Sequence, residues 1–105
     1  MTASEISAII EGEIGGDWSR SNAHGVDLRR CLVTPAEQVY EDSFKEGETL
    51  RLWLVLEERP ADKSGYKIVF DEGSRMFGLA TTNAARGRDL FLGFYGTFLE
   101  TLEGM

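Results

Sequence analysis

The residues best suited to chemistry in this chain lie in the segment SNAHGVD, positions 21–27, and just beyond it. His24 is the only histidine of the chain, and Cys31, seven positions later, is the only cysteine. A nucleophilic cysteine needs a base within hydrogen-bond reach and surroundings that favour its thiolate. This spacing, across a turn and then a strand, does not bring the two side chains together. We therefore expect Asn22 and Gly25 to shape a turn in which His24 bonds to the backbone.

A small ligand pocket is the alternative role for this segment. An imidazole, an amide and an indole can together hold a ligand, and a pair of arginines can clamp an anion. The residues expected to line such a pocket are Trp18, Asn22, His24, Arg86 and Arg88. This alternative is favoured if His24 lines a concave site with a second polar group at about 3 Å, and it fails if His24 faces bulk solvent.

Other sequence patterns that mark catalytic or cofactor sites are missing. A zinc site needs about four ligands at recognisable spacing, and the chain contains neither an HExxH nor a CxxC sequence. The glycines at 12, 15 and 16 follow a predicted helix rather than precede one, which is the wrong context for a phosphate-binding loop. The acidic pairs at 57–58 and 71–72 fall at a strand end and a turn, where solvated carboxylates are common. We predict no catalytic residue, no metal and no cofactor.

Composition narrows the partners that the protein could bind. Its 105 residues include 18 acidic and 11 basic ones, which gives a formal net charge of −7. Binding to nucleic acid or to an anionic membrane needs an excess of basic residues, so the charge argues against both and favours a basic protein partner. A single cysteine cannot form an internal disulfide, and the longest apolar run, 52–56, is too short to span a membrane. We expect a cytoplasmic protein.

The hydrophobic pattern predicts an α+β fold in one domain that spans residues 1–105. Thr2 and Glu5 have the spacing of a helix capping box, and isoleucines follow at helical intervals, so we expect a helix at about 3–14. Similar spacing after Thr97 predicts a short helix at about 97–104. Between the helices, five or six strands joined by hairpins should form an antiparallel sheet, at residues 26–33, 50–56, 66–71, 76–81 and 90–95, with 34–44 as the sixth.

The segment 34–44 is compatible with two structures. Thr34 again begins a capping-box spacing, with Pro35 at the first helical position, which favours a short helix. The β-branched Val39 favours an extended chain, in which Pro35 would lie at a sheet edge or a bulge. Because the residues 45–48, KEGE, have the character of a hairpin loop before the next strand, the strand is the favoured interpretation.

The predicted sheet is apolar on both faces. Alternate leucines in 50–56 suffice for one core. Antiparallel sheets with one wet face carry polar side chains on it, and monomers rarely expose large apolar patches. Either the two helices divide between the faces, or another chain docks on the second face, where Trp and Tyr would suit an interface. The residues of this second face are Trp53, Val55, Val69, Phe91 and Tyr95.

These patterns favour a non-catalytic protein-interaction module, comparable in size and charge to inhibitor or immunity proteins. Its partner would be another protein or a second copy of itself in a homodimer. The alternatives are a small enzyme or ligand-binding protein with a pocket around His24, and a homo-oligomer whose role is structural. Whether the protein is an enzyme stays open, and the absence of a catalytic motif from the sequence argues against it.

Overall fold

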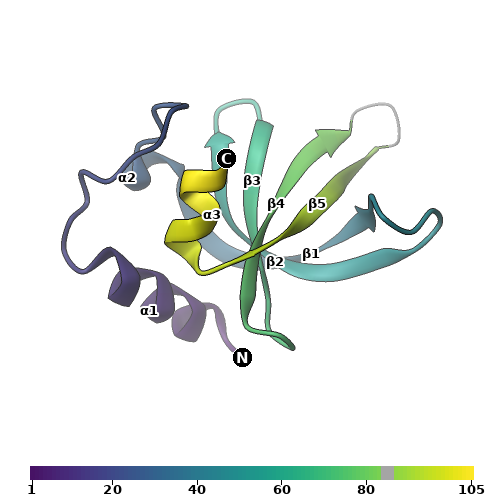
Figure 1. Ribbon diagram of the computed structural model, residues 1–105, viewed down its shortest axis with the longest axis horizontal. Helices are drawn as coiled ribbons and strands as arrows, with labels where there is room; N and C mark the ends of the chain where they lie inside the picture. Colours follow the sequence, from purple (N-terminus) through teal and green to yellow (C-terminus); the bar gives the residue numbers. More distant parts are fainter. Residues whose placement is uncertain (84–86) are drawn as a thin grey trace.

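The computed structural model describes residues 1–83 and 87–105 (Figure 1). In these residues the fold is α+β, with an antiparallel sheet between an N-terminal and a short C-terminal helix, as the sequence predicts. The elements follow in the order α1 (Ala3–Ile14), α2 (Leu28–Cys31), β1 (Leu32–Asp42), β2 (Thr49–Arg59), β3 (Ser64–Asp71), β4 (Met76–Asn83), β5 (Arg88–Gly96) and α3 (Phe98–Gly104).

Both terminal helices begin at a reciprocal capping box. Oγ1 of Thr2 accepts the N–H of Glu5 at 3.2 Å, and a carboxylate oxygen of Glu5 accepts the N–H of Thr2 at 3.0 Å. Thr97 and Glu100 repeat this arrangement at the start of α3. At the other end of α1, Gly15 has a φ of 60°, in the left-handed region that glycine adopts at helix ends without strain. Because these signals are local, the predicted bounds of both helices agree with the structure to within one residue.

The five strands close into a barrel. Neighbouring strands pair antiparallel from β1 through to β5, and residues 40–42 of β1 then pair in parallel with residues 89–91 of β5. In a meander with an odd number of strands, the first and last strands run in the same direction, so they can meet only in parallel. Hairpin patterns in the sequence do not indicate this closure, and it encloses one face of the sheet.

One residue from each strand meets inside the barrel. We call this set the barrel core, and its members are at most 3% exposed. Close approach of β4 and β5 requires Gly78, because a Cβ on it would overlap the carbonyl oxygen of Gly93 and would come within 3.0 Å of the Phe91 ring. The barrel core consists of Tyr40, Leu52, Val69, Ala80 and Phe91.

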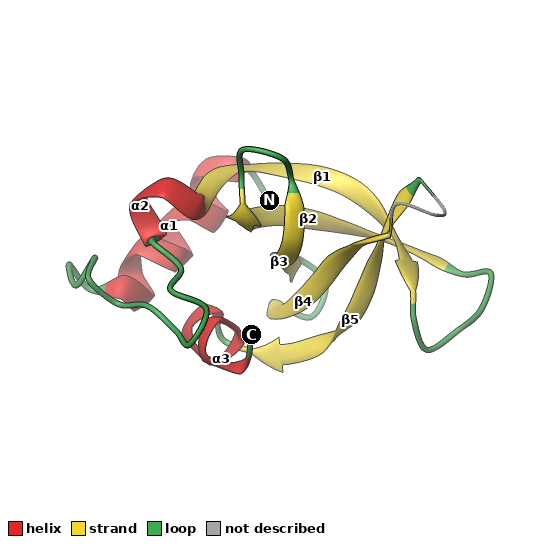
Figure 2. Cartoon of the chain, turned by 90° about the horizontal axis from the view of Figure 1, so that it is seen from above, coloured by secondary structure: helices red, strands yellow, loops and turns green. Residues whose placement is uncertain are grey.

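The opposite face of the strands is covered by the helices. Figure 2 shows the three helices gathered at one end of the barrel, with the β1–β2 hairpin at the other. In β3, Ile68 and Phe70 point to this helix side, while Val69 between them points into the barrel. Phe98 of α3 packs edge-on against Phe77 of β4, with ring centroids 5.7 Å apart. Both apolar faces of the sheet are therefore covered by the same chain.

The strand predicted at 26–33 is wrong over most of its length. α2 occupies its centre and begins where the carboxylate of Asp27 accepts the N–H of Arg29 at 3.0 Å. Leu28 and Cys31, three positions apart, are both buried, as one side of a helical turn requires. Aspartate at a helix start is a strong local signal, and the apolar spacing in this short segment fits either structure.

The segment 34–44 is extended over most of its length, as the favoured interpretation has it. β1 begins at Leu32 and ends at Asp42. Its register against β2 shifts between Leu32 and Ala36, and the buried Pro35 lies within this irregularity. A proline at a bulge costs no ladder hydrogen bond, which is why the strand tolerates it.

Candidate functional site

His24 lies at a pocket and contacts a carboxylate there. Its Nδ1 is 2.9 Å from Oε2 of Glu58, near the end of β2. An ionised carboxylate only accepts hydrogen bonds, so Nδ1 carries a proton and Nε2 is the ring nitrogen left for another partner. The ring of Tyr66 packs edge-on against the imidazole, with centroids 5.6 Å apart. The sequence predicts a backbone partner for the His24 side chain, and this is wrong: the partner is a side chain 34 positions along the chain.

The carboxylate of Glu58 is fixed at both oxygens. Oε1 accepts the N–H of Tyr66 at 3.0 Å, while Oε2 pairs with His24. Burial acts to raise the pKa of Glu58, but the hydrogen bonds from Tyr66 and His24 and the charges of His24 and Arg59 outweigh it, so the pKa lies below its usual value. The imidazole thus faces an ionised, immobile carboxylate that sets its orientation and its tautomer.

The pocket beside this pair has a volume of about 440 Å³. It lies between the loop that leads into α2 and the turn between β2 and β3. Cys31 is buried at its wall, with Sγ 3.6 Å from the carbonyl oxygen of Glu58. We call it the His24 pocket, and its lining comprises His24, Gly25, Val26, Asp27, Arg30, Cys31, Glu58, Arg59, Pro60, Ala61 and Asp62.

Asn22 shapes the turn before His24 and does not line the His24 pocket. Its Oδ1 accepts the N–H groups of His24 at 3.0 Å and Val26 at 3.3 Å. Its Nδ2 donates to the carbonyl oxygen of Leu102 at 2.8 Å and lies 3.4 Å from Sδ of Met105. The amide therefore ties the turn to α3, which is the turn-forming role expected from the sequence rather than a ligand contact.

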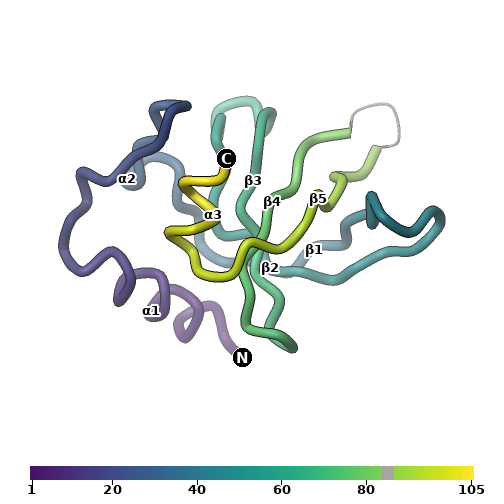
Figure 3. Tube along the Cα trace, in the orientation of Figure 1, coloured from purple at the N-terminus to yellow at the C-terminus, as the bar shows by residue number. Residues whose placement is uncertain are grey.

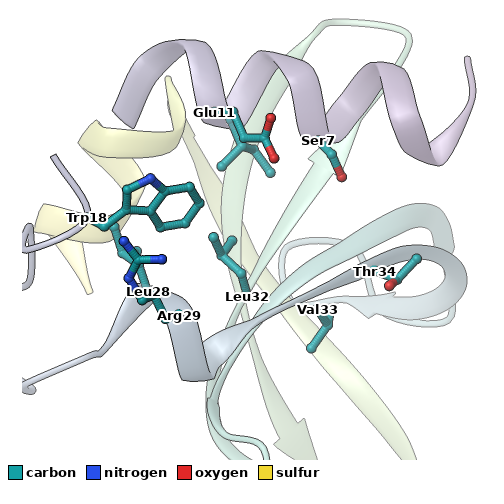
Figure 4. A pocket seen from close by; sticks show the side chains of 9 residues that line it. Ser7, Glu11, Trp18, Leu28, Arg29, Leu32, Val33 and Thr34 are labelled. Carbon is teal, nitrogen blue, oxygen red and sulfur yellow. The ribbon is translucent and has the colours of Figure 1, made fainter. Parts of the chain in front are cut away.

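Trp18 lines a different hollow, between α1 and the start of β1. Figure 4 shows its indole beside the guanidinium of Arg29, which lies 5.0 Å from the ring centroid. The hollow has a volume of about 370 Å³, and Ser7 and Glu11 of α1 line its other side. Trp18 is therefore close to the His24 segment in sequence but is not part of the His24 pocket.

Of the two arginines predicted to join His24, the structure describes Arg88, and Arg88 does not lie at the His24 pocket. Arg88 lies at the start of β5, at the hairpin end of the barrel, and the loop that carries His24 lies at the helix end (Figures 1 and 3). Arg86 lies outside the described residues. The arginines that line the His24 pocket are instead Arg30 of α2 and Arg59 of β2.

A second candidate site lies at the β1–β2 hairpin. Phe44 is 73% exposed there, the largest value among the large apolar side chains of the described residues, and its ring lies over Gly93 of β5. The carboxylate of Asp42 accepts the N–H of Phe44 at 2.8 Å, and the N–H of Ser43 bonds to the carbonyl of Phe91, so the position of the loop is fixed. Phe94 is also exposed, at 38%.

Acidic residues lie on the same hairpin as Phe44. A hollow of about 320 Å³ at this end of the barrel is lined by four acidic residues and, among the described residues, by one basic residue, Arg88. Lys45 lies on the same hairpin, with Nζ 3.9 Å from Glu48. We define the hairpin surface as the exposed Phe44 and the four acidic residues that line this hollow: Glu41, Asp42, Glu46 and Glu48.

The residues expected to form an apolar interface are divided between covered and accessible positions. Val55 belongs to the helix-side core, and Val69 and Phe91 belong to the barrel core, so the chain itself buries these three. Trp53 is half-buried and donates its indole N–H to Glu72 at 3.1 Å. Tyr95 is 45% exposed. Together they do not form one exposed face on which a second chain could dock.

Charged side chains lie beside the barrel core, at one end of the barrel. Lys67 points into the barrel with its side chain 4% exposed, and its ammonium lies 3.3 Å from a carboxylate oxygen of Asp89. It also donates to Oγ1 of Thr82 at 2.7 Å and to the carbonyl of Lys63 at 2.9 Å. Glu57 is paired with Lys67 across β2 and β3, and its buried Oε2 has no hydrogen-bond partner among the described residues. Burial, followed by the charges of Asp89 and Glu57, raises the pKa of Tyr40.

No protein-family model matches the chain, and neither does any curated protein or solved structure. Among the described residues, no group of three or more histidine, cysteine and acidic side chains is arranged to hold a metal ion. In the same part of the chain, no helix is long and apolar enough to cross a membrane. Inferences about function therefore rest on the geometry of the His24 pocket and the hairpin surface.

The sequence singles out His24 but not the side chains that lie next to it in the pocket. Glu58 is noted only as one of an acidic pair at a strand end, and Tyr66, Arg30 and Arg59 are not expected at the site. Their sequence signal is weak, because it depends on how the β2–β3 turn packs against α2. Phe44 had a clearer signal: an aromatic residue among acidic ones, immediately before a predicted hairpin loop.

Proposed function

We propose that the protein is a non-catalytic interaction module that binds a basic protein through the hairpin surface. The observation that carries this proposal is Phe44, an aromatic side chain 73% exposed beside a hollow lined by four carboxylates. Exposed aromatic residues at the centre of an interface supply much of its binding energy. The acidic rim adds attraction for a partner of opposite charge and raises the rate of encounter.

The hairpin surface is already ordered without a partner, which supports a binding role. Asp42 fixes the backbone at Phe44, and Ser43 bonds to β5. A preorganised loop loses little conformational entropy on binding, so more of its contact energy appears as affinity. Since four acidic residues line the hollow beside it, we expect an arginine or lysine of the partner to enter the hollow while Phe44 packs on an apolar patch of that partner.

The partner is best found by crosslinking from position 44 itself. A photoreactive phenylalanine analogue replaces Phe44 in cells that naturally produce the protein, and the matched control carries it at Ser74, in the turn between β3 and β4. Position 44 should yield an adduct with a basic protein that position 74 does not. The purified partner should then bind the Phe44→Ala variant at least about tenfold more weakly than the unchanged protein, and should bind the control variant Met76→Ala as tightly as the unchanged protein. Its affinity for all three proteins should fall as the salt concentration rises.

Three outcomes would contradict the proposal. Adducts from position 44 could be absent or match those from position 74, the captured protein could be acidic, or Phe44→Ala could bind as tightly as the unchanged protein. An adduct of the chain with itself, together with a dimer mass in solution, would replace the basic partner with the homodimer or structural homo-oligomer. We propose a cytoplasmic setting as well, because a lone thiol suits a reducing compartment.

A further inference from the structure

We propose that the His24 pocket binds a small molecule through an oxyanion group, a phosphate or a carboxylate, with Arg30 and Arg59 as its charged donors. This site is separate from the hairpin surface, and the proposal does not depend on the protein partner. It assigns a ligand class to a pocket of about 440 Å³ whose lining includes the oriented imidazole of His24 and the two arginines Arg30 and Arg59.

The acidic residues of the pocket are already engaged by donors of this chain. Asp27 accepts the N–H of Arg29 at 3.0 Å, and Asp62 accepts the N–H and the hydroxyl of Ser64 at 3.0 and 2.7 Å. Glu58 uses both of its oxygens, as described above. These hydrogen bonds stabilise the carboxylates in their ionised form and hold them in place.

The guanidinium groups, in contrast, keep their donors for another partner. Within residues 1–83 and 87–105, neither Arg30 nor Arg59 forms an ion pair or a side-chain hydrogen bond. Arg59 is attracted electrostatically by Glu58 and Asp62, which keeps it near the pocket. A guanidinium binds the oxygens of phosphate or carboxylate in pairs, with a strength and direction that an ammonium does not match.

The imidazole completes the site. Because Glu58 accepts from Nδ1, Nε2 is the ring nitrogen that can meet a ligand, and it makes no hydrogen bond within the described part of the chain. The doubly protonated ring donates from Nε2 as well as from Nδ1, and the ionised carboxylate of Glu58 then faces its positive charge. Three donors from α2, the preceding loop and β2 would thus surround one oxyanion.

The test uses His24 as its own probe, because the single histidine of the chain gives one set of imidazole proton signals in a nuclear magnetic resonance spectrum. The full chain is titrated at constant ionic strength with inorganic phosphate in one arm and with acetate in the other. We expect saturable shifts of the imidazole signals and of the amide signals at Arg30 and Arg59. If only phosphate causes saturable shifts, the ligand group is a phosphate; if only acetate does, it is a carboxylate. Shifts with both anions would mean that the pocket accepts either group.

Variants decide whether the arginines act as proposed. Arg30→Gln and Arg59→Gln should each weaken binding about tenfold. Arg51→Gln, an exposed arginine near Glu37 on β1, should leave it unchanged. The amide spectrum of each variant confirms that it is folded. The proposal is overturned if neither anion gives saturable shifts up to about 100 mM, if the shifts are spread over the whole surface, or if Arg51→Gln weakens binding as much as the pocket variants do.

Discussion

Replacement of Lys67 by methionine should strongly destabilise the barrel. The side chain points into the barrel, 4% exposed; its ammonium forms an ion pair with Asp89 and donates hydrogen bonds to Thr82 and to the carbonyl of Lys63. Methionine keeps most of the apolar stem, so the change removes the charge and its hydrogen bonds rather than the packing. It removes the counter-charge of Asp89 and leaves an uncharged side chain opposite Glu57, the residue that faces Lys67 across β2 and β3.

The expected loss is about 3 kcal/mol. Removal of one partner of a buried ion pair costs about 3–5 kcal/mol because the remaining charge is uncompensated. The side chain of Asp89 is 22% exposed, so water relieves part of that cost and the lower end of the range applies. In a domain of this size, about 3 kcal/mol lowers the melting temperature by roughly 12–24 °C.

Urea and thermal unfolding followed by tryptophan fluorescence measure the effect. Lys45→Met is the matched control, because Lys45 is exposed and its contact with Glu48 is long, so it should change the free energy of unfolding by less than about 0.5 kcal/mol. The double variant Lys67→Met, Asp89→Asn should lose less than the sum of its single changes, with a coupling above about 1.5 kcal/mol. A loss below about 1 kcal/mol for Lys67→Met, or strict additivity, would refute the assignment of Lys67 as the counter-charge.

Three further predictions concern packing and titration. Gly78→Ala should lower the free energy of unfolding in urea by about 1–3 kcal/mol, because the added Cβ overlaps the Gly93 carbonyl. Gly73→Ala is the control and should be tolerated, since its Cβ meets nothing closer than 3.7 Å. Equal costs for the two variants would contradict the close approach of β4 and β5. Because the folded state lowers the pKa of Glu58, its carboxylate stabilises the fold above its unfolded pKa, and this stabilisation is lost as the pH falls through the folded value. Glu58→Gln should therefore flatten the acid side of the stability profile, and Glu103→Gln should not. Trp53→Ala should lower the free energy of unfolding by about 2 kcal/mol, less than the loss for a fully buried tryptophan, because the side chain is half-buried. Trp53→Phe should restore most of this stability. An unchanged free energy of unfolding for Trp53→Ala would show that the indole lies in solvent.

Local signals explain which elements the sequence predicts well. Both terminal helices are marked by a hydroxyl and a carboxylate three positions apart, and both capping boxes form. The hairpins are marked by glycines and charged residues between apolar runs. The apolar pattern does not reveal α2, because four residues are too few to distinguish helical from extended spacing. Asp27, the helix cap, is the local signal for this helix.

Non-local features escape such an analysis. The parallel pairing of residues 40–42 with 89–91 joins segments almost fifty positions apart, and nothing in either segment indicates it. The same holds at the His24 pocket, where Glu58 reaches His24 only because the β2–β3 turn folds next to α2. The sequence therefore points to the histidine but not to Arg30 and Arg59, and Arg88, which is expected beside His24, lies at the start of β5 instead.

The apolar residues on the second face of the sheet are covered in different ways in a barrel and in an open sheet. In an open sheet, surplus apolar residues such as Val69 and Phe91 require a second chain to cover them. Closure of β1 on β5 covers them within one chain, so they carry no information about partners. Only an apolar side chain that stays exposed after the barrel closes can indicate an interaction role. Phe44 is such a residue, since its loop is ordered and its ring remains mostly in solvent.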